Sequence, residues 1–189
     1  QNSEQQRSMA SYLKANDPYK HPLLIHTPST GNDKEELLPA LLGHTPLDGL
    51  SFQIDRREQT HSEVIKWKRR SAEKGEEWMI TFDELGKWYR GVLPDEVDPT
   101  HDTVRHYALW GSLMAGGAGV EWYFGAKFPH NDLTTEDWRS RENMWVQTEH
   151  AVRFFDTHLP YWDMEARDEL TLRNDDYCLA KEGHVYAVY

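Results

Sequence analysis

The stretch WMITFDELG, residues 78–86, places two carboxylates, Asp83 and Glu84, directly after an apolar run. A run this short, ending in acidic residues and a glycine, predicts a buried strand that opens into a loop. Three further runs of the same kind lie at residues 23–26, 50–54 and 120–124. All four are predicted to be strands buried on both faces, as in a parallel sheet.

Segments with helical character lie before, between and after these strands. They cover residues 7–15, 34–42, 60–75, 99–115 and 134–155. Thr60 with Glu63 predicts a capping box, and Asp98 and Thr134 predict N-caps. Strands that alternate with helices predict parallel βαβ units and hence an α/β fold. A closed barrel and an open doubly wound sheet both fit this order, but no glycine-rich phosphate loop follows a strand, which counts against a dinucleotide-binding fold.

The last residues of the chain have a different character. Residues 177–180 and 185–189, joined through Lys181, Glu182 and Gly183, predict a β-hairpin. The chain is therefore predicted to divide into residues 1–172, which hold the strand–helix units, and residues 173–189. Two strands alone are marginal in water, so the second part is either a hairpin packed on the first or the start of a β-rich domain.

Composition argues against several classes of function. The net charge of −11 opposes binding to nucleic-acid phosphates, which needs clustered lysine and arginine. No apolar run approaches the roughly 20 residues of a membrane span, so neither nucleic acid nor membrane is expected as a partner. The single cysteine, Cys178, leaves no intrachain disulfide. No HExxH motif occurs, and His101 and His106 do not share a helix face, so we expect no metal and no other cofactor.

The carboxyl ends of parallel strands are where (β/α)8 enzymes hold their catalytic groups. These ends supply the candidate residues His26, Gln53, Asp83, Glu84, Glu121, Trp122 and Tyr123. Carboxylates beside aromatic rings suit glycoside hydrolysis, in which two carboxylates act on one glycosidic bond. Glu84 is the best candidate for a catalytic carboxylate, and the other six would bind the substrate. Because neighbouring strand residues point to opposite faces, only one of Asp83 and Glu84 is expected to face the site.

The same residues also have structural interpretations. Asp83 and Glu84 would then only cap or pair with the loop that follows them, and Glu121 would be a core carboxylate. Trp122 or Tyr123 would pack in the core, and His26 would be a hydrogen-bonded structural histidine.

Three segments carry a resemblance to a known family: ITFDELG (80–86), HDTVRHYALWGSLMAGGAGVEWYFG (101–125) and PHNDLTTEDWRSRENMW (129–145). The chain resembles bacterial glycoside hydrolases of secreted polysaccharide-degrading systems, from about residue 1 to its end. In that family a (β/α)8 TIM barrel precedes a β-sandwich described as collagen-binding. The resemblance implies that residues 1–172 are the carboxyl-terminal half of the barrel, strands five to eight, and that the start of the β-rich domain follows.

The resemblance also implies roles and partners. Glu84 would be the nucleophile of a two-carboxylate, retaining glycosidase that acts on a polysaccharide or oligosaccharide, and the acid/base would lie upstream of Gln1. Half a barrel exposes two unpaired parallel edges, so a partner is expected: the N-terminal half of the same barrel, or a second copy of the chain. The protein would be secreted or periplasmic.

Two other functions remain open from the sequence. A non-catalytic carbohydrate-binding or structural barrel would use the same aromatic residues without cleavage. A barrel enzyme with metal-assisted chemistry at Asp83 or Glu84 lacks a clear ligand pattern. The sugar and the linkage stay open, as does retaining versus inverting chemistry, which depends on the distance between the two carboxylates.

Overall fold

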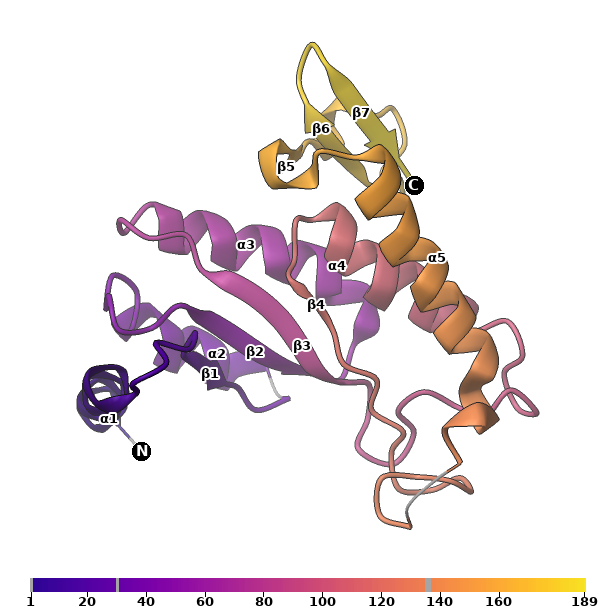
Figure 1. The fold of residues 1–189 in the computed structure, drawn as a ribbon, viewed down its shortest axis with the longest axis horizontal. Helices are drawn as coiled ribbons and strands as arrows, with labels where there is room; N and C mark the ends of the chain where they lie inside the picture. The colour runs from indigo at the N-terminus through magenta and orange to yellow at the C-terminus, as the bar shows by residue number, and fades with distance from the viewer. Residues whose placement is uncertain (1, 30, 135–136) are drawn as a thin grey trace.

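The centre of the molecule is a four-stranded, all-parallel sheet (Figure 1). The computed structural model describes residues 2–29, 31–134 and 137–189. The strands, in their order across the sheet, are β1 (Leu24–His26), β2 (Gly49–Ile54), β3 (Met79–Leu85) and β4 (Gly119–Val120). Strands that are neighbours in sequence are neighbours in the sheet, and helical segments connect them. The predicted α/β class is confirmed.

Within residues 2–29, 31–134 and 137–189, five α-helices and several shorter turns surround or extend the sheet. The α-helices are α1 (Ser3–Asn16), α2 (Gly31–Leu37), α3 (Thr60–Ala72), α4 (Gly111–Met114) and α5 (Glu142–His158). The 3₁₀ turns are η1 (Leu38–Ala40), η2 (Arg57–Gln59), η4 (Trp138–Arg141), η5 (Tyr161–Asp163) and η6 (Asp168–Leu170), and η3 (Val104–Trp110) is π-helical. Asn2 begins α1 with a capping box, because its side chain accepts from the Gln5 amide at 2.9 Å and the Gln5 side chain accepts from the Asn2 amide.

The predicted caps of the later helices are wrong. Thr60 makes no capping bond at the start of α3, and Glu63 instead accepts hydrogen bonds from Lys66 and from the Trp67 indole. Asp98 accepts from the His101 amide, so the next helix begins only after His101.

The other predicted cap, Thr134, is followed by two residues that lie outside the described part of the chain. The turn η4 starts four residues later and is capped by Asp137, whose side chain accepts from the Arg139 amide at 3.1 Å. The predicted fourth strand, 120–124, is also wrong in extent, since β4 contains only two residues. The chain beyond β4 leaves the sheet because the Tyr123 carbonyl accepts from the Val92 amide, in the loop after β3.

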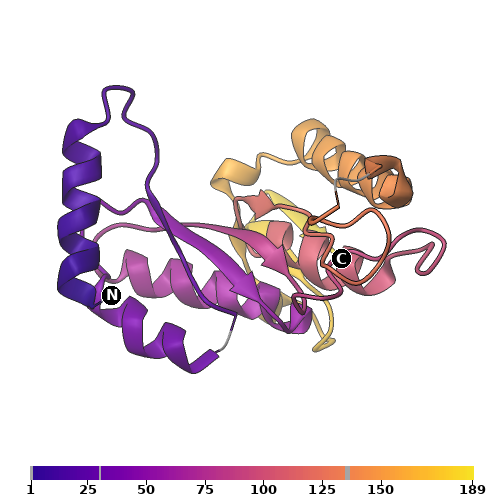
Figure 2. The same ribbon diagram turned by 90° about the horizontal axis from the view of Figure 1, so that it is seen from below.

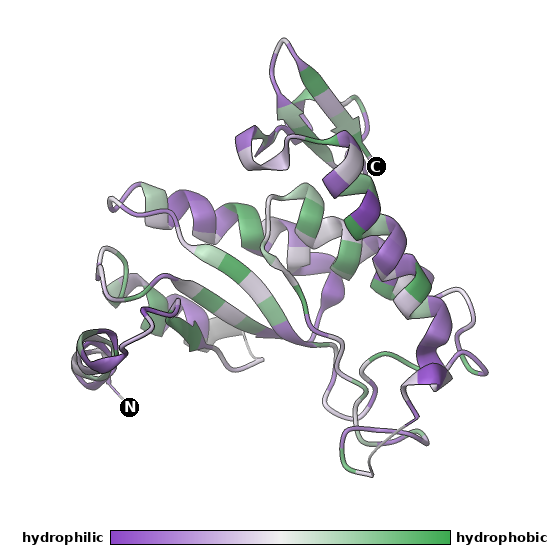
Figure 3. Cartoon of the chain, in the orientation of Figure 1, coloured by the Kyte–Doolittle hydropathy of each residue, from purple (hydrophilic) through white to green (hydrophobic). Residues whose placement is uncertain are grey.

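The two faces of the sheet differ in their covering. Leu50, Phe52 and Ile54 of β2, with Ile80 and Phe82 of β3, are buried on the side where α2 and α3 lie (Figure 2). The rings of Phe52 and Phe82 stack there at 5.3 Å. Over β1 to β3, none of the described helices covers the opposite face. Figure 3 shows the matching alternation of hydrophobic and polar positions along β2 and β3.

A second, antiparallel sheet follows α5. Its strands are β5 (Glu165–Ala166), β6 (Cys178–Lys181) and β7 (Val185–Val188). The predicted hairpin is confirmed as β6 and β7, with Gly183 at a φ of 76° in the turn. β5 pairs with β6, so residues before 173 also belong to this sheet.

Contacts with α3 and η3 hold the second sheet in place. His61 of α3 lies 2.7 Å from the Asp168 carboxylate and stacks on Tyr177 at 4.1 Å. Trp110 of η3 stacks on Tyr189 at 4.7 Å. Aromatic pairs of this geometry contribute about 0.5–1.5 kcal/mol beyond the area that they bury. The two sheets are therefore joined by specific side-chain contacts.

Candidate functional site

A β-bulge in β3 brings Asp83 and Glu84 to the same face of the sheet. The register pairs Phe52 with Phe82 and then Gln53 with Glu84, so that Asp83 is the extra residue. A bulge of this kind interrupts the alternation of side chains. The expectation that only one of the two carboxylates faces the site is therefore wrong. Both face the uncovered side of the sheet, because their partners come from the polar positions of β1 and β2.

Asp83 is the centre of a three-residue cluster. Its Oδ2 accepts a hydrogen bond from the Ser51 hydroxyl and lies 2.7 Å from His26 Nδ1. Ser51 and His26 are direct partners in the register of β1 and β2, so the sheet itself places them beside each other. The other oxygen of Asp83, Oδ1, is buried and has no hydrogen-bond partner among the described residues. The carboxylate fixes the imidazole through Nδ1, while about half of the His26 side chain stays exposed.

Glu84 lies next to this cluster on the same face. Its Oε2 accepts a hydrogen bond from the side-chain amide of Gln53. Tyr123 is also close: burial raises the pKa of its phenol, and the negative charges of Asp132 and Glu84 raise it further. An amide donor orients a carboxylate without neutralising it, so the Gln53 contact suits a carboxylate that works as an anion.

The loops after β3 and β4 are tightly joined beside these carboxylates. Gly91 has a φ of 51°, and a Cβ at this position would meet the Tyr123 carbonyl oxygen at 2.2 Å. The guanidinium of Arg57 donates to the carbonyls of Leu85 and Gly91, which fixes the start of the first loop. Burial lowers the pKa of Arg57, but this side chain stays a cation at any pH at which the protein is folded. The Tyr123 hydroxyl donates to the carbonyl of Trp88, whose indole is 66% exposed.

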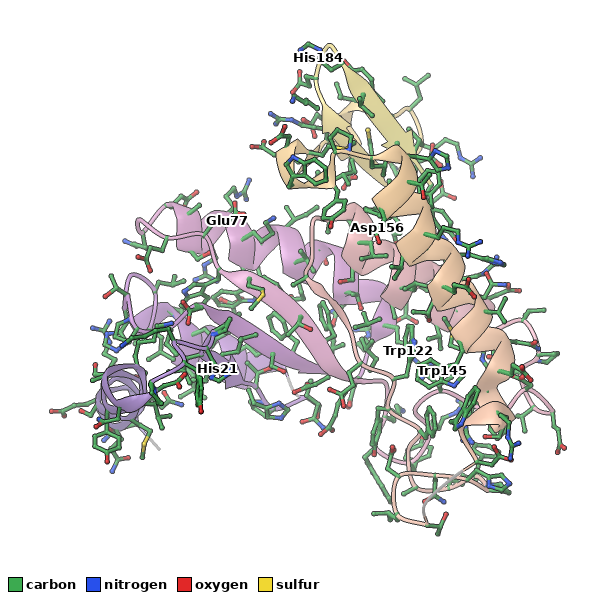
Figure 4. All side chains as sticks on the ribbon, viewed as in Figure 1. His21, Glu77, Trp122, Trp145, Asp156 and His184 are labelled. Carbon is green, nitrogen blue, oxygen red and sulfur yellow. The ribbon has the colours of Figure 1, made fainter. Side chains whose placement is uncertain are left out.

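The two remaining predicted residues differ in position. Glu121 is exposed and follows the end of β4, and its amide donates to the Phe82 carbonyl, so its backbone lies beside the start of the bulge. Trp122 is buried in the core, and its indole donates to the Thr148 hydroxyl of α5 at 2.8 Å. Figure 4 shows Trp122 beside Trp145, close to α5. The structure thus brings together His26, Gln53, Asp83 and Glu84, with Tyr123 and the backbone of Glu121 beside them, and it buries Trp122 in the core.

Sequence reasoning missed three residues of this region. Ser51 is the second hydrogen-bond donor to Asp83, and it could have been found two residues before Gln53 on the same predicted strand face. Trp88 and Arg57 lie in loop or turn segments, where no periodic signal points to them. Taken together, the site offers two adjacent carboxylates, an oriented imidazole and an exposed indole. Such groups can donate to and accept from hydroxyls, stack on an apolar ring face and attack an electrophilic carbon.

The described residues contain no group of three or more His, Cys, Asp or Glu side chains that could hold a metal ion. No helix among them is both long and apolar enough to cross a bilayer. Comparisons with known proteins found no match: neither a family model, nor a curated protein, nor a solved structure is similar to this chain.

Proposed function

We propose that this chain is the carboxyl-terminal half of a (β/α)8-barrel glycoside hydrolase, with Glu84 as a catalytic carboxylate. The observation that carries the proposal is the bulge in β3, which presents Asp83 and Glu84 together at the carboxyl end of a parallel sheet. This is the end at which barrel enzymes hold their catalytic groups. The uncovered face of β1 to β3 would be the inner wall of the barrel.

In the proposed mechanism Glu84 is the nucleophile. Its carboxylate, oriented by the Gln53 amide, attacks the anomeric carbon of the sugar. A carboxylic acid from the other half of the barrel protonates the leaving oxygen. The glycosyl–enzyme ester is then hydrolysed by water, and the same second carboxyl group removes the proton from that water. In an inverting enzyme one carboxylate would instead take a proton from the attacking water while the other, as the acid, protonates the leaving oxygen.

The neighbouring residues would bind the sugar. His26 is held by Asp83 through Nδ1, so its Nε2 is available to a sugar hydroxyl. The exposed indole of Trp88 offers a flat apolar surface for the face of a pyranose ring. Asp83 would act on the substrate through His26 and would be a positioning residue.

The edges β1 and β4 would pair with the N-terminal half of the barrel, which makes that half the expected partner. A protein with this substrate would be secreted or periplasmic and would serve polysaccharide degradation in a bacterium. The β-sheet of β5 to β7 would begin a β-rich domain.

The test uses a barrel assembled from this chain and its N-terminal half. Release of reducing ends from a panel of plant polysaccharides is compared for the unmodified protein, Glu84→Gln and Glu149→Gln. Glu149 is an exposed carboxylate on α5, paired with Arg153, and serves as the matched control. We expect Glu84→Gln to lower the rate by roughly a thousandfold or more, as loss of a nucleophile does, and Glu149→Gln to leave it unchanged.

Three results would contradict the proposal. An unmodified rate in Glu84→Gln would remove Glu84 from the reaction. Retention on glycans without release of reducing ends, even in long incubations, would favour a non-catalytic carbohydrate-binding barrel. Loss of hydrolysis on addition of a chelator would favour metal-assisted chemistry at the two carboxylates.

A further inference from the structure

A cavity of about 1120 Å³ lies far from Glu84, at the amino ends of β3 and β4. Its walls come from the second half of α3, residues 113–118, α5 and the segment from η5 to η6. Figure 4 labels two residues that line the cavity, Glu77 just before β3 and Asp156 of α5. The carboxylates of the proposed active site lie at the opposite end of the strands, so this is a separate site.

The cavity combines an apolar floor with an exposed aromatic rim. Phe155, Met164 and Leu179 are buried beneath it. At the rim, Tyr161 and Trp162 are both exposed, Trp162 to 72%, with their rings in edge-to-face contact at 5.3 Å. Both rings belong to η5, in which the Tyr161 carbonyl accepts from the Met164 amide at 3.2 Å. The indole of Trp162 is thus presented to solvent from an ordered turn.

The charged groups of the cavity are largely paired with one another or with near neighbours. Lys68 lies 3.1 Å from Glu77, and Asp163 lies 2.9 Å from Lys181. Arg167 contacts Glu165 at 3.4 Å. Six carboxylates and three cationic side chains line the cavity, so that it disfavours a polyanionic ligand. Carboxylate and guanidinium groups fixed in pairs still have free lone pairs and N–H groups that can bond to hydroxyls.

We propose that this cavity binds a neutral oligosaccharide chain, with one sugar ring stacked on Trp162. A flat apolar ring surrounded by paired polar groups matches a ligand that has an apolar ring face and many hydroxyl groups. A volume of this size accommodates more than a single small molecule, since ligand pockets are commonly about 300–1,000 Å³. The site would hold polymer without cleaving it, and its occupancy does not depend on hydrolysis at Glu84.

The experiment is affinity electrophoresis of the purified chain in gels that contain arabinoxylan, mixed-linkage β-glucan, galactomannan or arabinan. Polygalacturonate serves as the charged comparison. We expect at least one of the neutral polymers to retard the unmodified chain. In Trp162→Ala the apparent Kd should rise at least about tenfold, while Trp162→Phe, which keeps a flat ring, should retain part of the retardation.

Two control variants separate this site from other surfaces. Tyr19→Ala removes an aromatic ring that is 80% exposed and outside the cavity, and Glu84→Gln alters the proposed active site. Neither should change the retardation. The proposal is overturned if no neutral polymer retards the chain, if only polygalacturonate does, or if Trp162→Ala migrates like the unmodified chain. Loss of retardation in Glu84→Gln would move the binding to the open face of the sheet. Release of reducing ends tests hydrolysis at Glu84, and retardation in the gel tests binding at Trp162. Failure of either proposal can therefore be told apart from failure of the other.

Discussion

The difference between the two faces of β3 can be measured with one pair of substitutions. Phe82 is completely buried and stacks on Phe52, whereas Met79 is 38% exposed on the uncovered face. Truncating a buried phenylalanine to alanine lowers the free energy of unfolding by about 3–5 kcal/mol, because it removes apolar contacts and leaves a cavity. Since whole domains of this kind are stable by only about 5–15 kcal/mol, Phe82→Ala should lose a large part of the total.

Met79→Ala should lower stability by only about 1 kcal/mol or less. Water already reaches this side chain, so that no closed cavity forms and only part of the transfer free energy is lost. The assay is urea unfolding at neutral pH, followed by tryptophan fluorescence, with the free energy of unfolding taken from the midpoint and slope. If Met79→Ala proves as destabilising as Phe82→Ala, the face that carries Asp83 and Glu84 is covered in solution, and the argument for an open inner wall fails.

Three further perturbations test the loops, the second sheet and the core tryptophan. Gly91→Ala should lower the free energy of unfolding by about 1–3 kcal/mol, because the added Cβ would lie 2.2 Å from the Tyr123 carbonyl oxygen. Gly75 also has a positive φ but has open space around it, so Gly75→Ala should lower the free energy of unfolding less. Equal effects of the two substitutions in thermal melts would refute the contact at Gly91. Burial raises the pKa of Asp168, but hydrogen bonds from His61 and the Cys178 amide lower it more, so the net shift is downward. The ionised Asp168 therefore stabilises the folded protein above the unfolded pKa of about 3.9, and this stabilisation is lost as pH falls through the lower folded pKa. Asp168→Asn should remove this part of the acid sensitivity in urea titrations from pH 5 to 2. Trp122→Phe should lower stability by about 0.5–1.5 kcal/mol through loss of its bond to Thr148 and leave glycan retardation unchanged; weakened retardation at unchanged stability would return Trp122 to the binding site.

Much of the fold was predictable because its signals are local. Apolar runs bounded by proline, glycine and acidic residues predicted β1, β2 and β3, and the turn around Gly183 predicted the hairpin. The caps failed through competing local contacts. Glu63 accepts from Lys66 and Trp67 within its own helix, and Asp98 accepts from the His101 amide in a turn that ends before the next helix begins.

The sequence predicted which residues form the candidate site better than it predicted how they are arranged. Strand ends supplied His26, Gln53, Asp83 and Glu84, but alternation alone predicted that the two carboxylates would be separated. The bulge depends on how β3 pairs with β2, which no single strand encodes. The burial of Trp122 likewise depends on α5, which lies more than twenty residues further along the chain.

The bulge at Asp83 also reverses, partway along β3, whether the even-numbered or the odd-numbered residues are buried. Up to Phe82 the even-numbered residues of β3 are buried on the helix side, and beyond it the odd-numbered Leu85 takes that side. The number of residues between Phe82 and Leu85 is therefore as important for the two faces of β3 as the identity of those residues. Deleting one of the two carboxylates would restore simple alternation with Leu85 still in the apolar layer, and the uncovered face would keep only the other carboxylate. Substitutions at Asp83 or Glu84 preserve this spacing and the bulge, whereas a single-residue deletion there removes the bulge and with it the pairing of two carboxylates on one face.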